Sequence, residues 1–526
     1  MGSKGFSSLR DAYLVLPYTV TLRNTGATTL GAVANRYCTA LKCGVWNVID
    51  SLAVELDGKS ILTENDYKLY WNNIRCQTEW SSADLDKRGA DAFVAPDDWN
   101  SMAYTNVASA NGDGFCNNFS NETATAGIIP DQTQFAKNEG YIKRAYANPQ
   151  PTGLTNGAGV NPYNWITQRS PVATQIASQN GKGSFIYNAT PATTGQDAGV
   201  WFHIRLVDLH PIFKEFDLMA NPSLKLRIRC NAGFSDIAVT GAAAGTAPMS
   251  LTSTTMTSGN TVPVMLASAL TGNAMSGVLP TSGTTSLRLA FGPLENSLTT
   301  IKSYFPFSTA RLMVPFYDIA NPTAIVSKPV KKVTFSDCYA QFFQQRAGVG
   351  INATAQMNST FNLQLSAFQK NIKQVIVIPF SETSSGHYAT AQNIEQFRSP
   401  FDTAPWTCQP GSALRNVQVQ IGNDNVWNNV LQYDYEMFND EFSKLAAVNG
   451  GFSHELPNGL IDMQKFSTVH RYVVADCSRF TNKDVPQSIQ VSGTNASCQG
   501  ANLLVLVIYE RELSFDRLTG ELEISS

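Results

Sequence analysis

Short segments in which apolar and polar residues alternate dominate the chain. Residues 224–229 read Leu-Lys-Leu-Arg-Ile-Arg, so every second side chain is apolar and the others are basic. Val417, Val419 and Ile421 alternate with polar residues in the same way. A period of two residues is that of a strand with one buried face. The pattern therefore predicts a chain built mainly of short strands.

Patterns typical of helices are few. An aromatic stripe over residues 64–74 and another over 433–445 have the three-to-four-residue spacing of an amphipathic helix, and residues 211–216 predict a short turn of helix. Many strands with few helices are typical of sandwiches and barrels. We expect an all-β fold.

The same order of elements occurs twice. Residues 46–71 give a strand, an Asp-Gly turn and an aromatic helix, and residues 414–442 give a strand, a Gly-Asn turn and an aromatic helix. A strand pattern follows in each half, at 202–209 and at 470–476. Apolar segments, 310–317 in the first half and 503–509 in the second, are expected to close them. The order predicts a duplicated sandwich.

A chain of 526 residues is too long for one ordinary domain. The repeat predicts a first domain over residues 1–320 and a second over 321–526. Residues 97–200 and 232–308 interrupt the first domain and are too long for plain connections. We expect them to be elaborated surface loops that carry extra strands.

Composition narrows the function. The formal net charge is −3 and charged residues make up 15% of the chain. Extensive binding of nucleic acid needs a basic face, so we do not expect it. The first residues lack the apolar core of a secretory signal, and no apolar run is long enough to span a bilayer. Nine dispersed cysteines indicate reduced thiols in an intracellular product.

Five stretches resemble one family in their order along the chain. They are residues 9–18, 49–70, 205–213, 401–438 and 515–520. Together they are similar to the double jelly-roll major capsid proteins of polinton-like viruses and virophages. Each stretch alone is a weak motif, and their order carries the resemblance. It covers most of the chain outside the two long insertions.

The resemblance implies two fused eight-stranded jelly rolls, with long insertions mainly in the first and a few short helices. It implies a homotrimer of pseudo-hexagonal outline that tiles an icosahedral capsid around double-stranded DNA. The implied partners are neighbouring capsomers, a penton protein and minor capsid or cement proteins. The implied location is the shell of a virion assembled inside the host cell, with the insertions on the outer face.

No catalytic, cofactor or metal site is predicted, and we expect no enzyme. The histidines are His203, His210, His387, His454 and His470, and none lies in a zinc-protease motif. If their strand continued, His203 and His210 would lie on opposite faces, which speaks against a shared metal. The Asp208–His210 pair could serve acid–base chemistry, but we favour a structural role at a strand end.

Other candidates favour structural interpretations as well. Residues 181–184 lack the residues that complete a phosphate loop, and Cys38 and Cys43 have no second pair for a zinc site. Lys225, Arg227 and Arg229 could face an anionic partner, although a solvated or intersubunit strand face is favoured. The aromatic helices could form a ligand site, but we expect them to plug sandwich ends or to dock on a neighbouring subunit.

Two other functions remain open at this point. A carbohydrate-binding or carbohydrate-cleaving β-sandwich would suit the aromatic residues and the Asn-rich loops. The missing secretory signal and the lack of an evident pair of catalytic carboxylates speak against it. A viral spike or tail protein would also be rich in strands, but the chain has no fibre-like repeats.

Overall fold

The computed structural model describes parts of both predicted halves. The described residues are 5–24, 37–41, 44–64, 66–89, 91–94, 195–220, 222–239, 249–254, 264–268, 284–292, 309–343, 358–366, 369–381, 414–429, 432–448, 459–463, 466, 472–480, 485–496 and 501–523. The statements below concern these residues.

The second half contains eight main strands in two sheets. One sheet has the order β14-β21-β16-β19 and the other the order β15-β20-β17-β18. In chain order, the first, eighth, third and sixth strands form one sheet, and the second, seventh, fourth and fifth form the other. This is the strand order of a jelly roll. The strands are β14 (Val330–Phe343), β15 (Ser359–Gln364), β16 (Ile372–Ser381), β17 (Leu414–Ile421), β18 (Asp424–Asn425), β19 (Val473–Asp476), β20 (Ile489–Asn495) and β21 (Ala501–Asp516), with β22 (Leu522–Glu523) added to β21.

The predicted alternation builds the core of this jelly roll. Val417, Val419 and Ile421 face inward from β17 and are buried, as are Ile489 and Val491 from β20. The residues between them are polar and lie on the other face. One apolar face on each sheet therefore suffices to close the sandwich.

The first half repeats part of this order. Its smaller sheet has the order β5-β4-β7, and β11, β12 and β6 all pair with β2 in the larger sheet, which continues through β8 to β9. A separate pair joins β3 to β10, and another joins β1 to β13. The strands are β1 (Phe6–Ser7), β2 (Tyr13–Asn24), β3 (Tyr37–Leu41), β4 (Ile49–Leu56), β5 (Lys59–Glu64), β6 (Gly195–Arg205), β7 (Leu224–Cys230), β8 (Gly233–Val239), β9 (Met249–Thr254), β10 (Val264–Ser268), β11 (Thr284–Phe291), β12 (Arg311–Met313) and β13 (Phe316–Tyr317).

The two halves match strand for strand over their central parts. β7-β4-β5 corresponds to β20-β17-β18, and β6 and β2 correspond to β19 and β16. The tight turns also match, since Leu56 pairs with Lys59 across Asp57-Gly58 and Ile421 pairs with Asp424 across Gly422-Asn423. The prediction of an all-β double jelly roll is confirmed.

The number of strands in the first half differs from the expected eight. Within the described residues, no strand before β2 matches β14 or β15. β8 takes the place beside β11 that β14 takes beside β21, and the outer edge of β7 has no partner strand among these residues. β8 to β11 lie in the segment 232–308, and three strands of this predicted surface insertion, β8, β9 and β11, belong to the main sheet.

The segment expected to close the first half is interrupted. Residues 310–317 form β12, which pairs with β2, and β13, which pairs with β1. Pro315 lies between them, and proline cannot donate a ladder hydrogen bond. β11 continues the same edge of β2 beyond β12, so the long strand expected at 310–317 is replaced by two segments from different parts of the chain.

The helices begin later than the periodicity predicted. Glu64 still pairs with Leu52 in the sheet, so the aromatic helix expected over 64–74 is a 3-10 turn followed by an α-helix. The second aromatic helix, expected over 433–445, begins at Tyr435 and ends at Val448. The helical segments are η1 (Val45–Val48), η2 (Asp66–Tyr70), α1 (Trp71–Glu79), α2 (Ser82–Arg88), α6 (Leu206–Leu209), η6 (Pro211–Lys214), α8 (Thr323–Ser327) and α9 (Tyr435–Val448).

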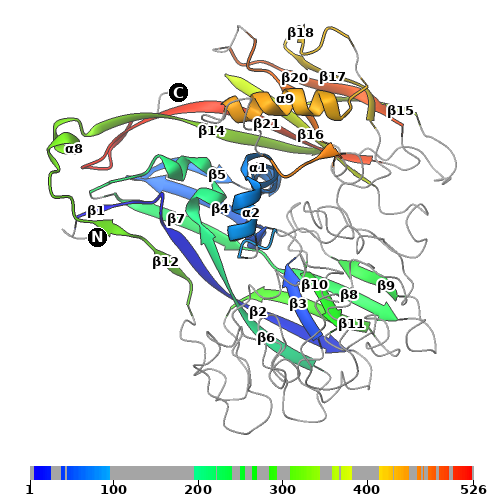
Figure 1. Cartoon of the computed structure of the whole chain (residues 1–526), viewed down its shortest axis with the longest axis horizontal. Coiled ribbons are helices and arrows are strands. Elements are labelled where there is room, and N and C mark those ends of the chain that lie inside the picture. The colour runs from blue at the N-terminus through cyan, green and yellow to red at the C-terminus, as the bar shows by residue number, and fades with distance from the viewer. Residues whose placement is uncertain are drawn as a thin grey trace.

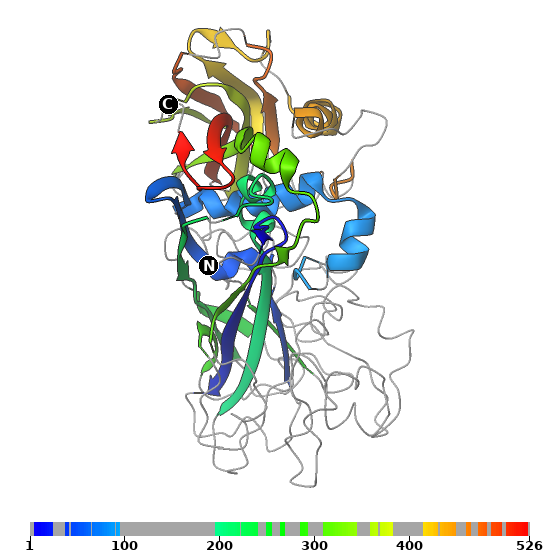
Figure 2. The same cartoon turned by 90° about the vertical axis from the view of Figure 1, so that its left-hand side faces the viewer.

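The two halves lie one above the other in Figure 1, with the second half at the top. Helix α1 lies between them, and β14 and β21 extend past the second sandwich toward α8. Figure 2 shows the same stacking from the side, with β2 and β6 running away from the junction. The far ends of β14 and β21 also enter the first core, where Phe335 and Phe515 pack among its buried residues. The halves therefore share a continuous apolar contact.

Candidate functional site

The junction between the halves brings together both aromatic helices. Tyr70 and Trp71 at the start of α1 pack with Phe438 of α9 in one buried cluster. The same cluster contains the outward-facing residues of the β14-β21-β16-β19 sheet, such as Ile376 and Leu506. The helices therefore cover the outer face of the second jelly roll from within the same chain. The helices lie against a sheet face, so the expectation that they plug sandwich ends is wrong, whereas docking on a neighbouring subunit stays a prediction.

Polar contacts also cross this junction. Arg511 of β21 donates to the carbonyl of Ile61 on β5 at 3.2 Å and to Asp337 at 2.7 Å. Tyr472 donates its hydroxyl hydrogen to the Gln77 side chain at 2.7 Å, and both residues are buried. Buried directional bonds of this kind fix how two apolar surfaces meet.

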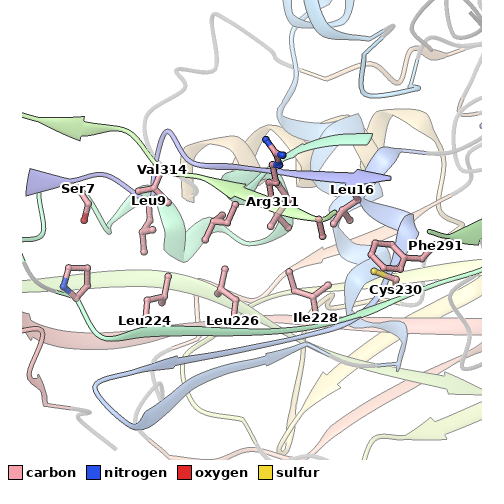
Figure 3. Close-up of a pocket in the computed structure, with 14 residues that line it drawn as sticks. Ser7, Leu9, Leu16, Leu224, Leu226, Ile228, Cys230, Phe291, Arg311 and Val314 are labelled. Atoms are coloured by element: carbon pink, nitrogen blue, oxygen red, sulfur yellow. The ribbon is translucent and has the colours of Figure 1, made fainter. Parts of the chain in front are cut away.

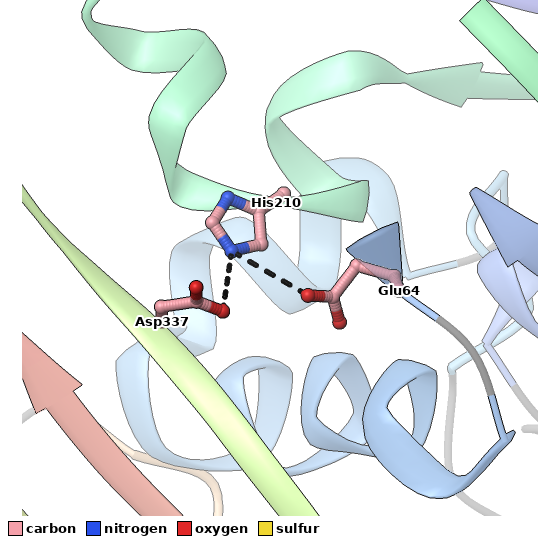
Figure 4. A group of neighbouring side chains, drawn as sticks. All are labelled: Glu64, His210 and Asp337. Atoms are coloured by element: carbon pink, nitrogen blue, oxygen red, sulfur yellow. Dashed lines mark ion pairs between the residues drawn. The ribbon is translucent and has the colours of Figure 1, made fainter. Parts of the chain in front are cut away.

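Three titratable side chains meet in the centre of the junction: Glu64, His210 and Asp337 (Figure 4). The His210 Nε2 atom lies 3.7 Å from Asp337 Oδ1 and 4.0 Å from Glu64 Oε1. All three residues are buried. Histidine nitrogens and carboxylate oxygens are common metal ligands, so a metal ion is one candidate occupant of this cluster.

The hydrogen bond on the other ring nitrogen speaks against a metal. His210 Nδ1 accepts a hydrogen bond from the backbone N–H of Ile212 at 3.2 Å. In neutral histidine the proton then lies on Nε2, which points at the carboxylates as a donor. A metal-bound histidine instead donates from its second nitrogen, so this residue would need to reverse its tautomer and lose that bond. The Nδ1 hydrogen bond therefore speaks against a metal at this cluster.

Charge distribution within the cluster is unequal. Burial, and then the neighbouring carboxylate of Asp337, raise the pKa of Glu64 well above its usual range. Burial also acts on Asp337, but His210 and Arg511 outweigh it and hold the pKa of Asp337 below its usual value. Burial lowers the pKa of His210. We infer a protonated Glu64, a neutral His210 and an ionised Asp337 that pairs with Arg511.

The Asp208–His210 pair suggested by the sequence does not form. Asp208 pairs with Arg88 at 2.7 Å and with Arg205 at 2.9 Å, on the exposed side of α6. Helix α6 interrupts the strand before His210, so the argument from opposite strand faces no longer applies. His203 stays on β6, exposed and stacked on Tyr13.

The other candidates give no clustered site within the described residues. His387, His454, His470, Cys43 and residues 181–184 lie outside them. Cys38 lies on β3. Cys76, Cys338 and Cys477 are buried free thiols, as expected for packed cysteines, and burial raises the pKa of each.

The basic residues of β7 face outward and are exposed. Lys225 and Arg227 both pair with Glu55 on β4, at 3.3 and 3.2 Å, and Arg229 pairs with Asp50 at 3.2 Å. Neighbouring carboxylates thus compensate much of this charge, although two cations share one of them. The arrangement agrees with a solvated or contact-forming strand face.

Six large apolar residues along the connection between the halves, residues 311–330, are exposed, and we call them the connecting band. Large apolar residues normally avoid such exposure when they lie close together, and a patch of them marks a contact surface. The members of this connecting band are Leu312, Met313, Phe316, Tyr317, Val326 and Val330, whose side chains are 36–60% exposed. The apolar pattern of residues 310–317 predicts a strand that closes the first half, and it does not predict this exposure.

The sequence carried only a faint signal for the buried cluster. Asp337 interrupts the apolar alternation of β14, and Glu64 ends β5 immediately before the aromatic helix. Such a charged residue within a strand pattern is also common on solvent faces. Only the contact between the two halves makes these positions buried.

Comparison with known proteins returns solved structures alone. No protein-family model and no curated protein sequence matches this chain. The crystal structure of the mavirus major capsid protein matches at 10% identity and a TM-score of 0.36, over 100% of this chain and 85% of that one. The cryo-electron microscopy structure of the Sputnik virophage matches at 9% identity and 0.44, over 99% and 84%.

PBCV-1 Vp54, fitted into a reconstruction of Sputnik, matches at 8% identity and a TM-score of 0.31, over 100% of this chain and 94% of that one. These superpositions are loose, so the fold rests on the strand order described above. Among the described residues, no helix is long and apolar enough to cross a membrane.

Proposed function

We propose that this chain is a structural protein of a viral shell, the major capsid protein of a double-stranded DNA virus. The observation that supports the proposal most strongly is the duplication of a jelly-roll sheet order within one chain. Because each chain contains two sandwiches, a trimer contains six similar sandwiches. Three copies can then fill a six-fold position of a lattice, with the heterologous contacts that a closed trimer requires.

The domain division proposed from the sequence, 1–320 and 321–526, fits the sheets. β1 to β13 supply the sheets of the first half, and β14 to β22 supply those of the second. The connecting band lies on the segment between them. We propose that a second copy covers this band in a homotrimer, because its large apolar residues are exposed in the single chain. Obligate interfaces of this kind commonly bury about 2,000–5,000 Å². Neighbouring capsomers, a penton protein and minor or cement proteins are the further partners, in a virion assembled inside the host cell.

The carbohydrate alternative gains no support from the junction. Glu64 and Asp337 are two carboxyl groups in one cluster, as a glycosidase requires, but both are buried. A sugar could not reach them without separating the two halves. The described geometry therefore favours a structural function.

Mass in solution and particle imaging test this proposal. We expect light scattering to give three times the chain mass of 57.2 kDa and electron microscopy to show pseudo-hexagonal particles. Phe316→Glu, in the connecting band, should shift the trimer to monomer because it places a charge in the interface core. Val485→Glu is the matched control, since Val485 is similarly exposed but lies outside the band. A wild-type monomer at micromolar concentration, or a trimer that resists Phe316→Glu, would contradict the proposed interface.

A further inference from the structure

The smaller sheet of the first half has an incomplete edge. In the second half, β15 pairs antiparallel with β20, Leu363 lying opposite Val491 and Phe361 opposite Gly493. β7 takes the place of β20 in the first half, but it pairs only with β4 among the described residues. Among the described residues, the backbone groups along its other edge therefore have no strand partner.

Side-chain burial shows the same difference. The inward residues of β7, Leu224, Leu226 and Ile228, are half-buried, although their partners on β4 are fully buried. At the equivalent positions of β20, Ile489 and Val491 are fully buried. The loss of burial is thus confined to the strand that lacks an outer neighbour.

A cavity of about 510 Å³ occupies the place left open (Figure 3). The inward residues of β7 form one wall, and Leu9, Leu14 and Leu16 form the facing wall with Phe291, Leu312 and Val314. Figure 3 shows the two rows of side chains pointing toward each other across the gap. Most of the side chains that line the cavity are apolar, so filling it with apolar side chains would be favourable.

We propose that this groove, the β7 slot, accepts an extended strand from another polypeptide by β-augmentation. Backbone hydrogen bonds to β7 would supply affinity, and alternate side chains in the cavity would supply specificity. The proposal rests on the sheet geometry of the first half and does not require the capsid function. A minor capsid protein would be one source of such a strand, but the recognised chemistry is the alternating segment itself.

The second half specifies the chemistry of the incoming strand. Leu56 and Ile421 end equivalent strands, and their partners are Leu224 and Ile489, so β7 and β20 can be aligned residue by residue. On this alignment, inward apolar residues lie opposite Leu226 and Ile228. Ile228 replaces Gly493, against which the ring of Phe361 packs closely. The position opposite Ile228 should therefore take valine or alanine in preference to phenylalanine.

The outer face adds a charge preference. Residues of the incoming strand that alternate with the apolar ones would lie beside Lys225, Arg227 and Arg229. Glu55 is shared by two of these cations, so their charge is incompletely balanced. Acidic residues at these positions would form favourable cross-strand pairs. The expected occupant is an extended segment with apolar residues at every second position and acidic residues between them.

A labelled peptide tests the slot without altering the protein. The probe is the sequence of residues 359–366 with the changes F361V, N362E and Q364E, added to the full-length chain and followed by fluorescence polarisation. We expect saturable binding that weakens at least tenfold when the three inward residues of the probe are replaced by serine. Exchanging the two glutamates for lysines should weaken it at least threefold at low salt.

Cys230 reports the register of the bound strand. It is a half-buried free thiol at the end of β7, and its equivalent Asn495 pairs with Ser359. A probe that also carries S359C should form a disulfide with Cys230 under mild oxidation, detected by mass spectrometry. A probe carrying T360C is the matched control, since this side chain would point to the other face. Cys230→Ser in the protein should abolish the crosslink.

Three results would overturn the proposal. The first is no saturable binding of the probe, as expected if another part of the chain already fills the slot. The second is equal crosslinking of the S359C and T360C probes, which would indicate contact without a β-register. The third is competition by a fatty acid for the cavity without any binding of the probe, which would indicate a small-molecule pocket.

Discussion

The second half of this chain closes its smaller sheet with a strand of its own, whereas no described strand of the first half covers the matching edge. The central strands and turns of the two sheets correspond, yet the inward residues of β20 are buried and those of β7 are not. The chain therefore contains an internal control for strand addition. Burial in a jelly roll depends on the neighbouring strand as much as on the residue itself.

The largest expected effect tests that contrast directly. Ile489→Ala removes a fully buried side chain, so we expect the free energy of unfolding to fall by about 3–4 kcal/mol. Leu224→Ala, at the equivalent position, should lower it by only about 1 kcal/mol because Leu224 is half-exposed. Denaturant titration measures both. Equal losses would show that the β7 edge is covered in solution.

The next prediction concerns the junction that joins the unequal halves. Asp337→Ala removes the partner of Arg511 and leaves its guanidinium partly buried, so the stability should fall by about 3 kcal/mol. Lys332 is the matched control on the same strand, since its exposed pair with Glu512 should contribute under about 0.5 kcal/mol in a Lys332→Ala variant. The same denaturant titration applies, and a similar small loss for both variants would argue against a buried ion pair.

A smaller, pH-dependent effect is expected at Glu64. Its folded-state pKa is raised above the usual value of 4.5, so its contribution to stability is fully present below pH 4.5 and is lost as pH rises through the folded-state pKa. Glu64→Gln keeps the shape and removes the titration. We expect the variant to be more stable than the wild type by about 1–2 kcal/mol at pH 8 and to show little advantage at pH 4. Thermal unfolding across this range measures the difference.

A pH-independent difference between these two proteins would contradict a buried, protonated Glu64. His210 has a lowered pKa, so its own contribution is present above 6.5 and is lost as pH falls. The titration of His210 changes the free energy of unfolding of the variant and of the wild type in the same direction. The comparison of the variant with the wild type therefore isolates the glutamate.

The amino-acid sequence by itself determined the all-β class, the duplicated order of strand, turn and aromatic helix, and the strands at 224–229 and 417–421. These features depend on local periodicity and on turn residues, which act over a few neighbouring positions. Asp57 and Gly58 both adopt the positive φ values that their hairpin turn requires, so a local signal was sufficient there.

Only the tertiary structure decided which strands are neighbours and which charged residues become buried. β11 joins β2 across more than 250 residues, although its segment resembled a loop insertion. Pro315 divides the closing strand that was expected at residues 310–317 into β12 and β13. Glu64, His210 and Asp337 meet because three distant segments pack at one junction. Periodicity describes one strand at a time, whereas sheet order and burial are properties of contacts between strands. The open edge of β7 is such a property, and no feature within residues 224–230 predicted it.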